Sequence, residues 1–489
     1  MTPIVSDIVE QARLAARAFA EFGEHLLHPT VRLGVTGLSR AGKTVFITAL
    51  LHGLLRGGRF PVFEPLANGR IAGAKLAPQP DDAVPRFDYE GHVRSVVIER
   101  QWPESTRQIS ELRVVIDYQS AGGAMRTLTL DIVDYPGEWL LDLPLLDKSY
   151  EQWSAATLAQ LRRTTRPPLP TAFLDRVASI DPFAPADEFA AIEAARLFTD
   201  YLQARRKEHQ TLSMIGPGRF LMPGDLAGSP ALTFAPLLLP ADREPPSGSA
   251  WAMMRRRYDS YRDAVVRPFF RDHFARLDRQ IVLADALAAF NSGPEALHDL
   301  EAALAGILDC FNIGRSTLLT RLFRPRIDRI LFAATKADHL HHSSHDRLEA
   351  VLRRAVTQAV ARAENTGAAI DVVALAAVRA TREAQVAHGR DKLPSILGTP
   401  AAGESAGGEF FDGNTEVATF PGDLPLDPEP LFNGTDAFRG LATGAAEKSD
   451  FRFLRFRPPK LEREGTDEPT LPHIRLDRAL QFLIGDKLS

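Results

Sequence analysis

The sequence of 489 residues has little that suits a secreted, membrane-spanning or nucleic-acid-binding protein. Its one cysteine, Cys310, excludes an intramolecular disulfide. No run of about 18 apolar residues occurs, so we expect no spanning helix. The formal net charge is −4, without the basic excess or basic tail that would neutralise nucleic-acid phosphates. Asp7 and Glu10 stand where a signal peptide would carry Lys or Arg, which predicts a cytoplasmic protein.

Apolar strands and amphipathic helices alternate along the rest of the chain. Strand-like runs lie at residues 31–36, 111–118, 126–133, 279–284, 329–334 and 370–375, with the second and third forming a hairpin. Helical periodicity separates several of these runs and extends through much of residues 139–278. This order predicts an α/β fold with a parallel sheet. Residues 57–88, rich in glycine and proline, are expected to be a long surface excursion.

A phosphate-loop motif, G-x-x-x-x-G-K-[ST], stands at residues 37–44 as GLSRAGKT, between the first strand and a helix predicted at 43–55. Backbone N–H groups and the positive end of the helix dipole would surround phosphate oxygens there. Lys43 would neutralise the β- and γ-phosphates, and the Thr44 hydroxyl would bind Mg²⁺. The predicted nucleotide contacts are Gly37, Ser39, Arg40, Ala41, Gly42, Lys43, Thr44 and Val45.

A second motif, Asp134-Tyr135-Pro136-Gly137, ends the predicted hairpin. A carboxylate at the end of a strand beside a phosphate loop is suited to hold a water molecule on Mg²⁺, so Asp134 joins Thr44 as a predicted metal residue. Gly137 can offer its N–H to the γ-phosphate.

A third motif, Thr335-Lys336-Ala337-Asp338, follows the strand at 329–334 and favours guanine. The Asp338 carboxylate can accept hydrogen bonds from guanine N1–H and its exocyclic amine, an arrangement that adenine lacks. The alternative is a solvated Lys–Asp pair in a loop. Four histidines lie just after this motif: His339, His341, His342 and His345. A zinc site needs three or four convergent ligands, whereas these histidines occupy one short loop. We therefore favour an exposed loop, with His339 near the base, over a zinc site.

The three motifs together resemble those of the Ras-like GTPases of the P-loop superfamily. That resemblance implies a mixed six-stranded sheet with an antiparallel second strand. It implies Thr106, or alternatively Ser105, as a switch I ligand of Mg²⁺. The family's fifth motif, which usually begins with Ser, is matched by Ala376-Ala377-Val378. Because the Ser is missing, the resemblance implies only backbone contacts to the base, from Ala377 or Val378. Trp102 is either a base-side contact or a core tryptophan.

The hydrolytic residues depart from the Ras-like pattern. Glu138 stands where the family usually has Gln after D-x-x-G. A carboxylate there could orient the attacking water or accept its proton, although it would bring negative charge to the γ-phosphate. It could instead be a first-turn helix residue favoured by the helix dipole. Arg40 and Arg107 are candidate catalytic arginines supplied in cis; the alternative is that they are surface or structural residues.

A closer resemblance is to the YcjX-like family of bacterial stress-associated GTP-binding proteins. It rests on GLSRAGKT, WPESTR, DYPGEWLLDLPLL, ADALAAFNSGPEAL and LFAATKADHLHH. It implies GTP and GDP binding, slow Mg²⁺-dependent GTP hydrolysis, a link to envelope stress, and a membrane-protein partner that would hold the protein at the inner membrane. The expected organisation is an N-terminal helix (1–30), a GTPase domain in two parts (31–138 and 279–397), an inserted helical domain (139–278) and a C-terminal extension (398–489) with a loop, a short strand at 451–456 and a final helix at 473–488.

Two rival functions remain open from the residues alone. A P-loop ATPase or small-molecule kinase would need adenine-compatible contacts at residues 335–338. A nucleotide-binding scaffold with negligible hydrolysis is the other rival, because Glu138 replaces Gln.

Overall fold

The structure is a computed structural model of the chain. It describes residues 29–38, 40–104, 108–164, 168–209, 216–240, 243–311, 327–364, 368–388, 391–406, 408–433, 453–461 and 469–489. The helix predicted within residues 1–30 lies outside this part of the chain. No helix among the described residues combines the length and the apolar character needed to cross a membrane.

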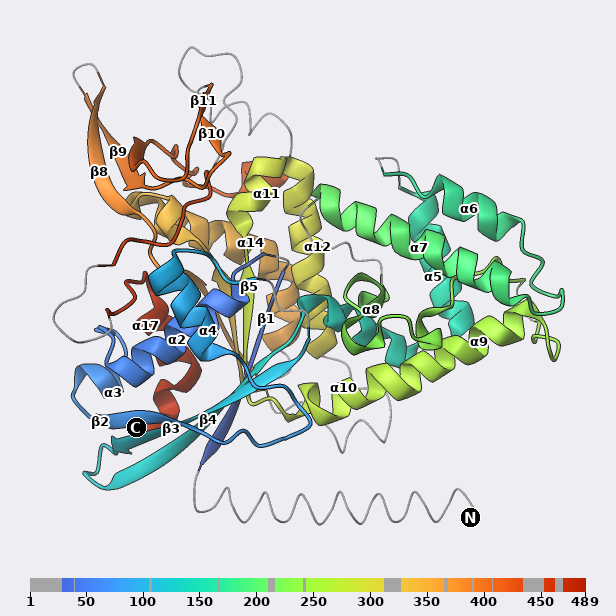
Figure 1. Ribbon diagram of the computed structural model, residues 1–489, viewed down its shortest axis with the longest axis horizontal. Coiled ribbons are helices and arrows are strands. Elements are labelled where there is room, and N and C mark those ends of the chain that lie inside the picture. Colours follow the sequence, from blue (N-terminus) through green and yellow to red (C-terminus); the bar gives the residue numbers. More distant parts are fainter. Residues whose placement is uncertain are drawn as a thin grey trace.

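A mostly parallel sheet of seven strands, in the order β2-β3-β4-β1-β5-β6-β7, forms the centre of the molecule (Figure 1). The strands are β1 (Thr30–Gly37), β2 (Ile71–Ala77), β3 (Ser110–Gln119), β4 (Met125–Asp134), β5 (Arg279–Ala284), β6 (Arg329–Ala334) and β7 (Ala369–Ala374). β1 pairs in parallel with β4 and β5, whereas β3 is antiparallel to β2 and β4. The predicted hairpin and parallel strands are therefore confirmed.

The prediction of six strands is wrong, because β2 adds an antiparallel strand at the edge of the sheet. It lies within residues 57–88, which we expected to be a surface excursion. Its sequence, IAGAKLA, is built largely of small residues, and all of its side chains keep some exposure. An edge strand of this kind lacks both the continuous apolar run of a central strand and a clear alternation.

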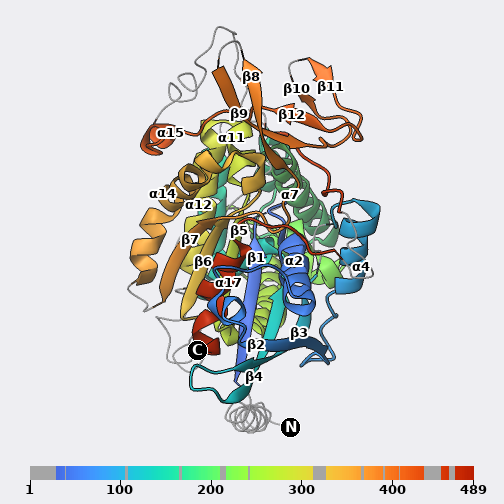
Figure 2. The ribbon, with the colours of Figure 1, turned by 90° about the vertical axis from the view of Figure 1, so that its left-hand side faces the viewer.

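Helices cover both faces of the sheet (Figure 2). α2 (Lys43–Arg56) and the C-terminal α17 (Leu476–Ile484) share one buried apolar cluster with β1, β3 and β4. α12 (Pro294–Phe311) and α14 (His345–Glu364) contribute to a second cluster with β5 and β6. This packing explains the fully buried sequence RQIVLA of β5, which has helices on both sides.

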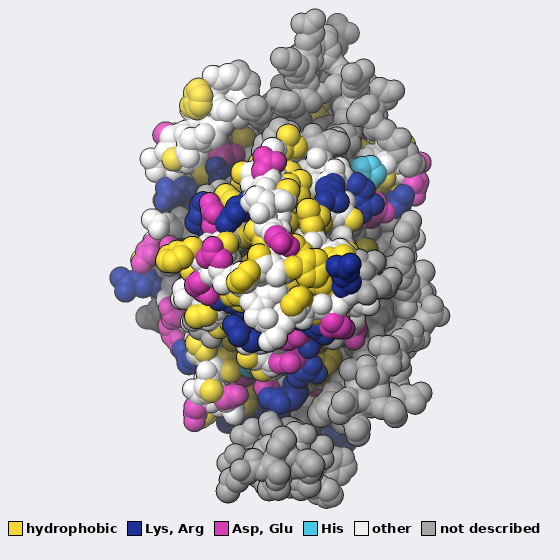
Figure 3. Space-filling view, turned by 90° about the vertical axis from the view of Figure 1, so that its right-hand side faces the viewer, with side chains coloured by type: hydrophobic (Ala, Val, Ile, Leu, Met, Phe, Trp, Pro, Cys, Tyr) yellow, Lys and Arg dark blue, Asp and Glu magenta, His cyan; other side chains and the backbone are white. Residues whose placement is uncertain are grey.

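Between β4 and β5 the described residues form helices and loops, apart from one isolated β-bridge between Pro185 and Ser249. The main helices are α5 (Tyr150–Arg162), α6 (Thr171–Ala178), α7 (Glu188–His209), α9 (Ala250–Tyr261) and α10 (Arg267–Asp272). They extend to one side of the sheet (Figure 1), and at their far end apolar and charged side chains are interspersed (Figure 3). Their buried residues, such as Trp153 and Tyr258, belong to the same cluster as Val282 and Phe332 of the sheet.

The C-terminal part contains more regular structure than we expected. β8 (Arg382–His388), β9 (Asp391–Gly398) and β12 (Val417–Thr419) form a small antiparallel sheet, so the described residues of the extension are not simply a loop. β10 (Ser405–Ala406) pairs with β11 (Glu409–Phe410), and α15 (Glu429–Asn433) follows. The described residues of the strand predicted at 451–456 form only an isolated bridge from Phe456 to Pro400.

Candidate nucleotide site

The phosphate loop joins the end of β1 to the start of α2. Gly42, which precedes the helix, has a φ of 83°, and this left-handed conformation favours glycine. No side chain caps the first turn of α2, and that turn has no acidic residue. The N–H groups and the positive dipole of this helix end are therefore suited to an anion. The Lys43 Nζ lies 3.5 Å from the carbonyl oxygen of Gly37.

A cavity of about 280 Å³ opens beside this loop. It is lined by residues from five separate parts of the chain: residues 40–46, 102–104, 335–339, 375–378 and 455–456, together with Glu138 and Arg206. Thirteen predicted residues meet there: Arg40, Ala41, Gly42, Lys43, Thr44, Val45, Trp102, Glu138, Lys336, Asp338, His339, Ala377 and Val378. Ser39, Ser105, Thr106 and Arg107 lie outside the described residues.

The remaining predicted residues, Gly37, Asp134 and Gly137, are not among the residues that line the cavity. Asp134 is only 2% exposed, and in the parallel pairing of β1 and β4 it is the partner of Val35. A Cβ atom on Gly137 would lie 2.2 Å from the carbonyl oxygen of Gly37, so the second motif packs directly on the phosphate loop and needs glycine there. Thr44 and Asp134 supply a hydroxyl and a carboxylate, both hard oxygen ligands that fit Mg²⁺.

Asp338 and Lys336 also line the cavity. Asp338 is 3% exposed, and its Oδ2 accepts a hydrogen bond of 2.7 Å from the Ala380 N–H. The Lys336 Nζ pairs with Asp285, the residue before α11 (Ala286–Ser292), rather than with Asp338. The alternative of a solvated Lys–Asp pair is therefore wrong: the carboxylate is buried and oriented by the backbone.

Aromatic side chains form another part of the cavity lining. The Trp102 Nε1–H donates a 2.6 Å hydrogen bond to the carbonyl oxygen of Phe456, and the Phe456 ring lies edge-on to His339 at 5.2 Å between centroids. Trp102 is 38% exposed, which contradicts its interpretation as a core residue. Burial lowers the pKa of His339, so its imidazole is neutral near pH 7.

Arg455 and Phe456 also line the cavity, although no sequence pattern predicted either of them. Phe456 is 354 residues from Trp102 in the sequence and belongs to no motif. Arg206, on α7, was missed for the same reason. No local pattern would have indicated any of the three.

The residues after Gly137 contact the helices between β4 and β5. They form a 3-10 helix, η2 (Gly137–Asp147), against the short helix α8 (Gly218–Leu221). The Asp142 carboxylate accepts hydrogen bonds from the Gly218 N–H at 2.7 Å, the Arg219 N–H at 3.2 Å and the Tyr261 hydroxyl at 2.7 Å. Arg219 also lies over the Trp139 ring, 3.2 Å from its centroid. Burial raises the pKa of Asp142 to about 6.

Glu138 lies within the same helix η2 and is 3% exposed. Its Oε1 is 2.8 Å from Nη2 of Arg206. A carboxylate that lines the phosphate end of the cavity is thus already paired with an arginine from the helical segment.

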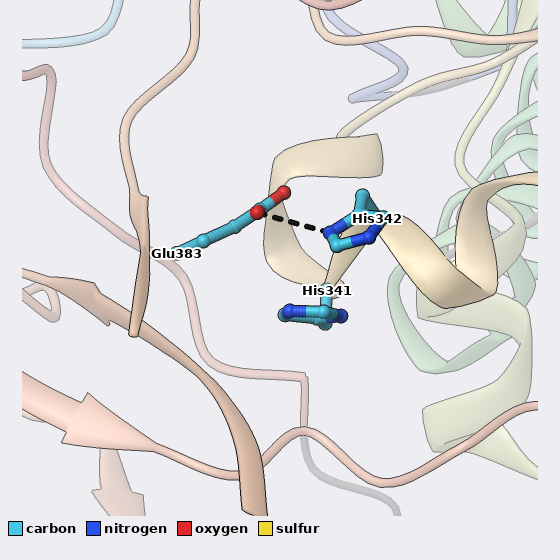
Figure 4. Close-up of side chains that lie close together, drawn as sticks. All are labelled: His341, His342 and Glu383. Atoms are coloured by element: carbon cyan, nitrogen blue, oxygen red, sulfur yellow. Dashed lines mark hydrogen bonds and ion pairs between the residues drawn. The ribbon is translucent and has the colours of Figure 1, made fainter. Parts of the chain in front are cut away.

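Three of the side chains on the histidine loop and on β8 lie close together (Figure 4). The His342 Nδ1 is 2.9 Å from Oε2 of Glu383, and one ligand atom each from His341, His342 and Glu383 all fall within 4.8 Å of one another. The group could hold a divalent ion at the surface. However, His342 and Glu383 are exposed, and the His341 Nδ1 lies 3.0 Å from the Ser343 hydroxyl. The loop of His341 and His342 is therefore at the surface, whereas His339 lines the cavity.

A phosphate loop between a parallel strand and a helix, facing a mostly parallel α/β sheet, defines this chain as a P-loop protein. Within that class the chain belongs to the YcjX-like family, DUF463, whose family model matches residues 31–488. It is 39% identical to the Ras-like GTPase YcjX of Escherichia coli K12 over 478 residues, which cover 94% of this chain and 96% of that protein. It is 36% identical to the Ras-like GTPase YcjX of Shewanella oneidensis over 500 residues, which cover 95% of this chain and 97% of that protein.

Proposed function

We propose that this protein binds GTP and GDP and hydrolyses GTP slowly with the help of Mg²⁺. The buried Asp338 carboxylate is the observation that carries this proposal. Because the Ala380 N–H holds its Oδ2, the carboxylate keeps one orientation at the cavity wall. A fixed anionic acceptor can take hydrogen bonds from two neighbouring N–H groups, as guanine presents, whereas adenine has no such pair. The names of the two relatives, both Ras-like GTPases, agree with this choice of base.

The residues at the start of α2 support the proposal that the cavity binds the phosphates of the nucleotide. Lys43 and the N-terminal amides of α2 would bind the phosphate oxygens, and Thr44 and Asp134 would hold Mg²⁺ directly or through water. The bound ion would neutralise the charge that develops on the phosphates. Gly137, which packs on the phosphate loop, could donate its N–H to the γ-phosphate.

The same contacts support the proposal of a switch. Within residues 137–147, Gly137 packs on the phosphate loop, and Asp142 accepts hydrogen bonds from α8 and Tyr261. A movement of Gly137 toward a γ-phosphate would therefore be transmitted to the helical segment. Hydrogen-exchange protection of α8 and η2 should differ between GDP and a non-hydrolysable GTP analogue. Identical protection in both states would contradict the switch.

A nucleotide-binding scaffold with negligible hydrolysis is the second candidate. The observation that favours it is the ion pair of Glu138 with Arg206, because a carboxylate engaged in this way is poorly placed to accept a proton from water. Single-turnover measurements on the wild type and on Glu138→Ala distinguish the two. Turnover in neither protein would support the scaffold.

A binding panel of GTP, GDP and ATP, each with and without Mg²⁺, tests the main proposal. We expect binding of both guanine nucleotides and none of ATP at matched concentration. Tighter binding of ATP would favour a P-loop ATPase or kinase instead.

The cellular role that we propose, a bacterial stress response in the cytoplasm with a membrane-protein partner at the inner membrane, rests on the family resemblance alone. Fractionation of cells with and without envelope stress tests it. A protein that never associates with the membrane fraction, and whose deletion leaves stress survival unchanged, would argue against this role.

A further inference from the structure

Arg206 reaches the nucleotide cavity from the helical segment, far from every motif in the sequence. It lies near the C-terminal end of α7, and its guanidinium lines the cavity together with Lys43 and Glu138. Contacts with Glu138, Met222 and Leu221 orient this group. Nη2 is 2.8 Å from Oε1 of Glu138, and Nη1 lies 3.0 Å from the Met222 sulfur and 3.5 Å from the Leu221 carbonyl oxygen.

The location of Glu138 makes this arginine significant. Glu138 directly follows Gly137, which packs on the phosphate loop, so the ion pair lies at the phosphate end of the cavity. A buried carboxylate alone would repel the negative charge of a triphosphate. Arg206 compensates that charge, and its planar fork can bind phosphate oxygens as well as a carboxylate.

We propose that Arg206 is the arginine that stabilises γ-phosphoryl transfer, supplied in cis by the helical segment. This inference rests on the proposed GTPase function. Glu138 holds the guanidinium when no γ-phosphate is present, and the γ-phosphate oxygens take over the pairing when GTP enters.

The reaction balances without any other reactant. Water attacks the γ-phosphorus, and the bond from this phosphorus to the β–γ bridging oxygen breaks. The electron pair leaves on GDP, and the water becomes part of inorganic phosphate and releases a proton. Arg206 neither gains nor loses a proton, since it donates hydrogen bonds to the oxygens on which negative charge accumulates.

The two arginines proposed from the sequence fit this role less well. Arg40 is exposed and has no hydrogen bond or ion pair with other described residues, so nothing there orients its guanidinium. Arg107 lies outside the described part of the chain. Electrostatic stabilisation of a transition state depends on groups that are oriented before the reaction. The guanidinium of Arg206 is oriented in this way by its contacts with Glu138 and Met222.

The test compares Arg206→Ala and Arg206→Lys with Arg196→Ala. Arg196 is an exposed residue of the same helix that pairs only with Asp200 among the described residues, so it is a matched control. Three properties are measured: the Kd for GDP, the gain in GDP affinity when aluminium fluoride is added, and the single-turnover rate at saturating GTP. Aluminium fluoride with GDP mimics the transferring phosphoryl group, and this readout does not depend on turnover.

For Arg206→Ala we expect a single-turnover rate about 1,000-fold below that of the wild type. Its Kd for GDP should remain within about threefold, and the aluminium fluoride gain should disappear, because the arginine contributes only when the phosphoryl group is present. Arg206→Lys keeps the positive charge beside Glu138, so this variant should fold even if the alanine variant does not. It should still lose most of the single-turnover rate, because an ammonium group lacks the planar pair of donors of a guanidinium. Arg196→Ala should match the wild type.

Folded Arg206→Lys with a wild-type rate and a full aluminium fluoride gain would overturn the assignment. A wild type that binds GTP without any turnover or aluminium fluoride gain would also overturn it, while leaving nucleotide binding intact. A wild type that binds no guanine nucleotide would instead refute the proposed function on which the assignment rests.

Discussion

Replacing Asp338 by Asn should change which base the cavity accepts. The Asp338 carboxylate is 3% exposed, and its Oδ2 accepts a 2.7 Å hydrogen bond from the Ala380 N–H. Asn has only one acceptor oxygen. Because the Ala380 N–H is buried and needs an acceptor, that oxygen should stay on it and the Asn amide nitrogen should face the base. Guanine would then meet a donor where it had found an acceptor.

The magnitude follows from the hydrogen bonds that are lost. Hydrogen bonds to a charged group are worth roughly 1.5–3 kcal/mol each. The substitution would remove at least one of the two proposed bonds and place the Asn amide N–H against an N–H of guanine, so the binding free energy should weaken by about 3 kcal/mol. This corresponds to a Kd for GTP about 100-fold higher. Xanthine carries a carbonyl oxygen where guanine has its exocyclic amine, so xanthosine triphosphate should gain affinity by about the same factor.

Competition binding against a fluorescent GDP analogue measures both changes, with Asp82→Asn as the control because Asp82 is exposed and lies outside the cavity. Unchanged GTP affinity in a folded Asp338→Asn protein would refute the reasoning. So would a wild type that binds xanthosine and guanosine triphosphates equally well.

Three further predictions concern the contacts around η2 and the proposed metal site. Burial raises the pKa of Asp142 from its ordinary value of 3.8 to about 6, so the folded state binds this proton more tightly than the unfolded state. The contribution of this group to the free energy of unfolding therefore falls as the pH rises from 3.8 to about 6. Asp142→Asn should remove a drop of about 3 kcal/mol; urea unfolding of both proteins at pH 4 and 7 measures it, and parallel pH profiles would contradict it. Gly218→Ala places a Cβ 1.8 Å from the Glu138 carbonyl oxygen and should destabilise the protein by about 1–3 kcal/mol, visible as a lower Tm; an unchanged Tm would show that η2 and α8 separate freely. Thr44→Ala should weaken GTP binding by about tenfold or more in Mg²⁺ and hardly at all in EDTA, and an equal loss in both media would exclude Thr44 as a metal ligand.

Local residue patterns are enough to predict most of the sheet and the principal motifs. β5 and β6 occupy the residues predicted for them, because short apolar runs rich in β-branched residues, such as IVLA at residues 281–284, favour buried strands. The phosphate loop is equally local, since the left-handed Gly42 and the start of α2 lie within a few residues of each other. Signals of this kind depend on neighbours along the chain, and so the sequence alone contains them.

Long-range packing accounts for what the patterns did not predict. β2 exists as a strand because the edge of β3 offers backbone hydrogen-bond partners, rather than because IAGAKLA has a strong strand pattern. Phe456 and Arg206 reach the cavity from segments whose sequences carry no nucleotide motif, and only the folded chain brings them beside Trp102 and Glu138. The chain thus encodes the type of site locally, at the phosphate loop and at Asp338. The contacts of Trp102 with Phe456 and of Glu138 with Arg206 join residues far apart in the sequence, which no local signal specifies.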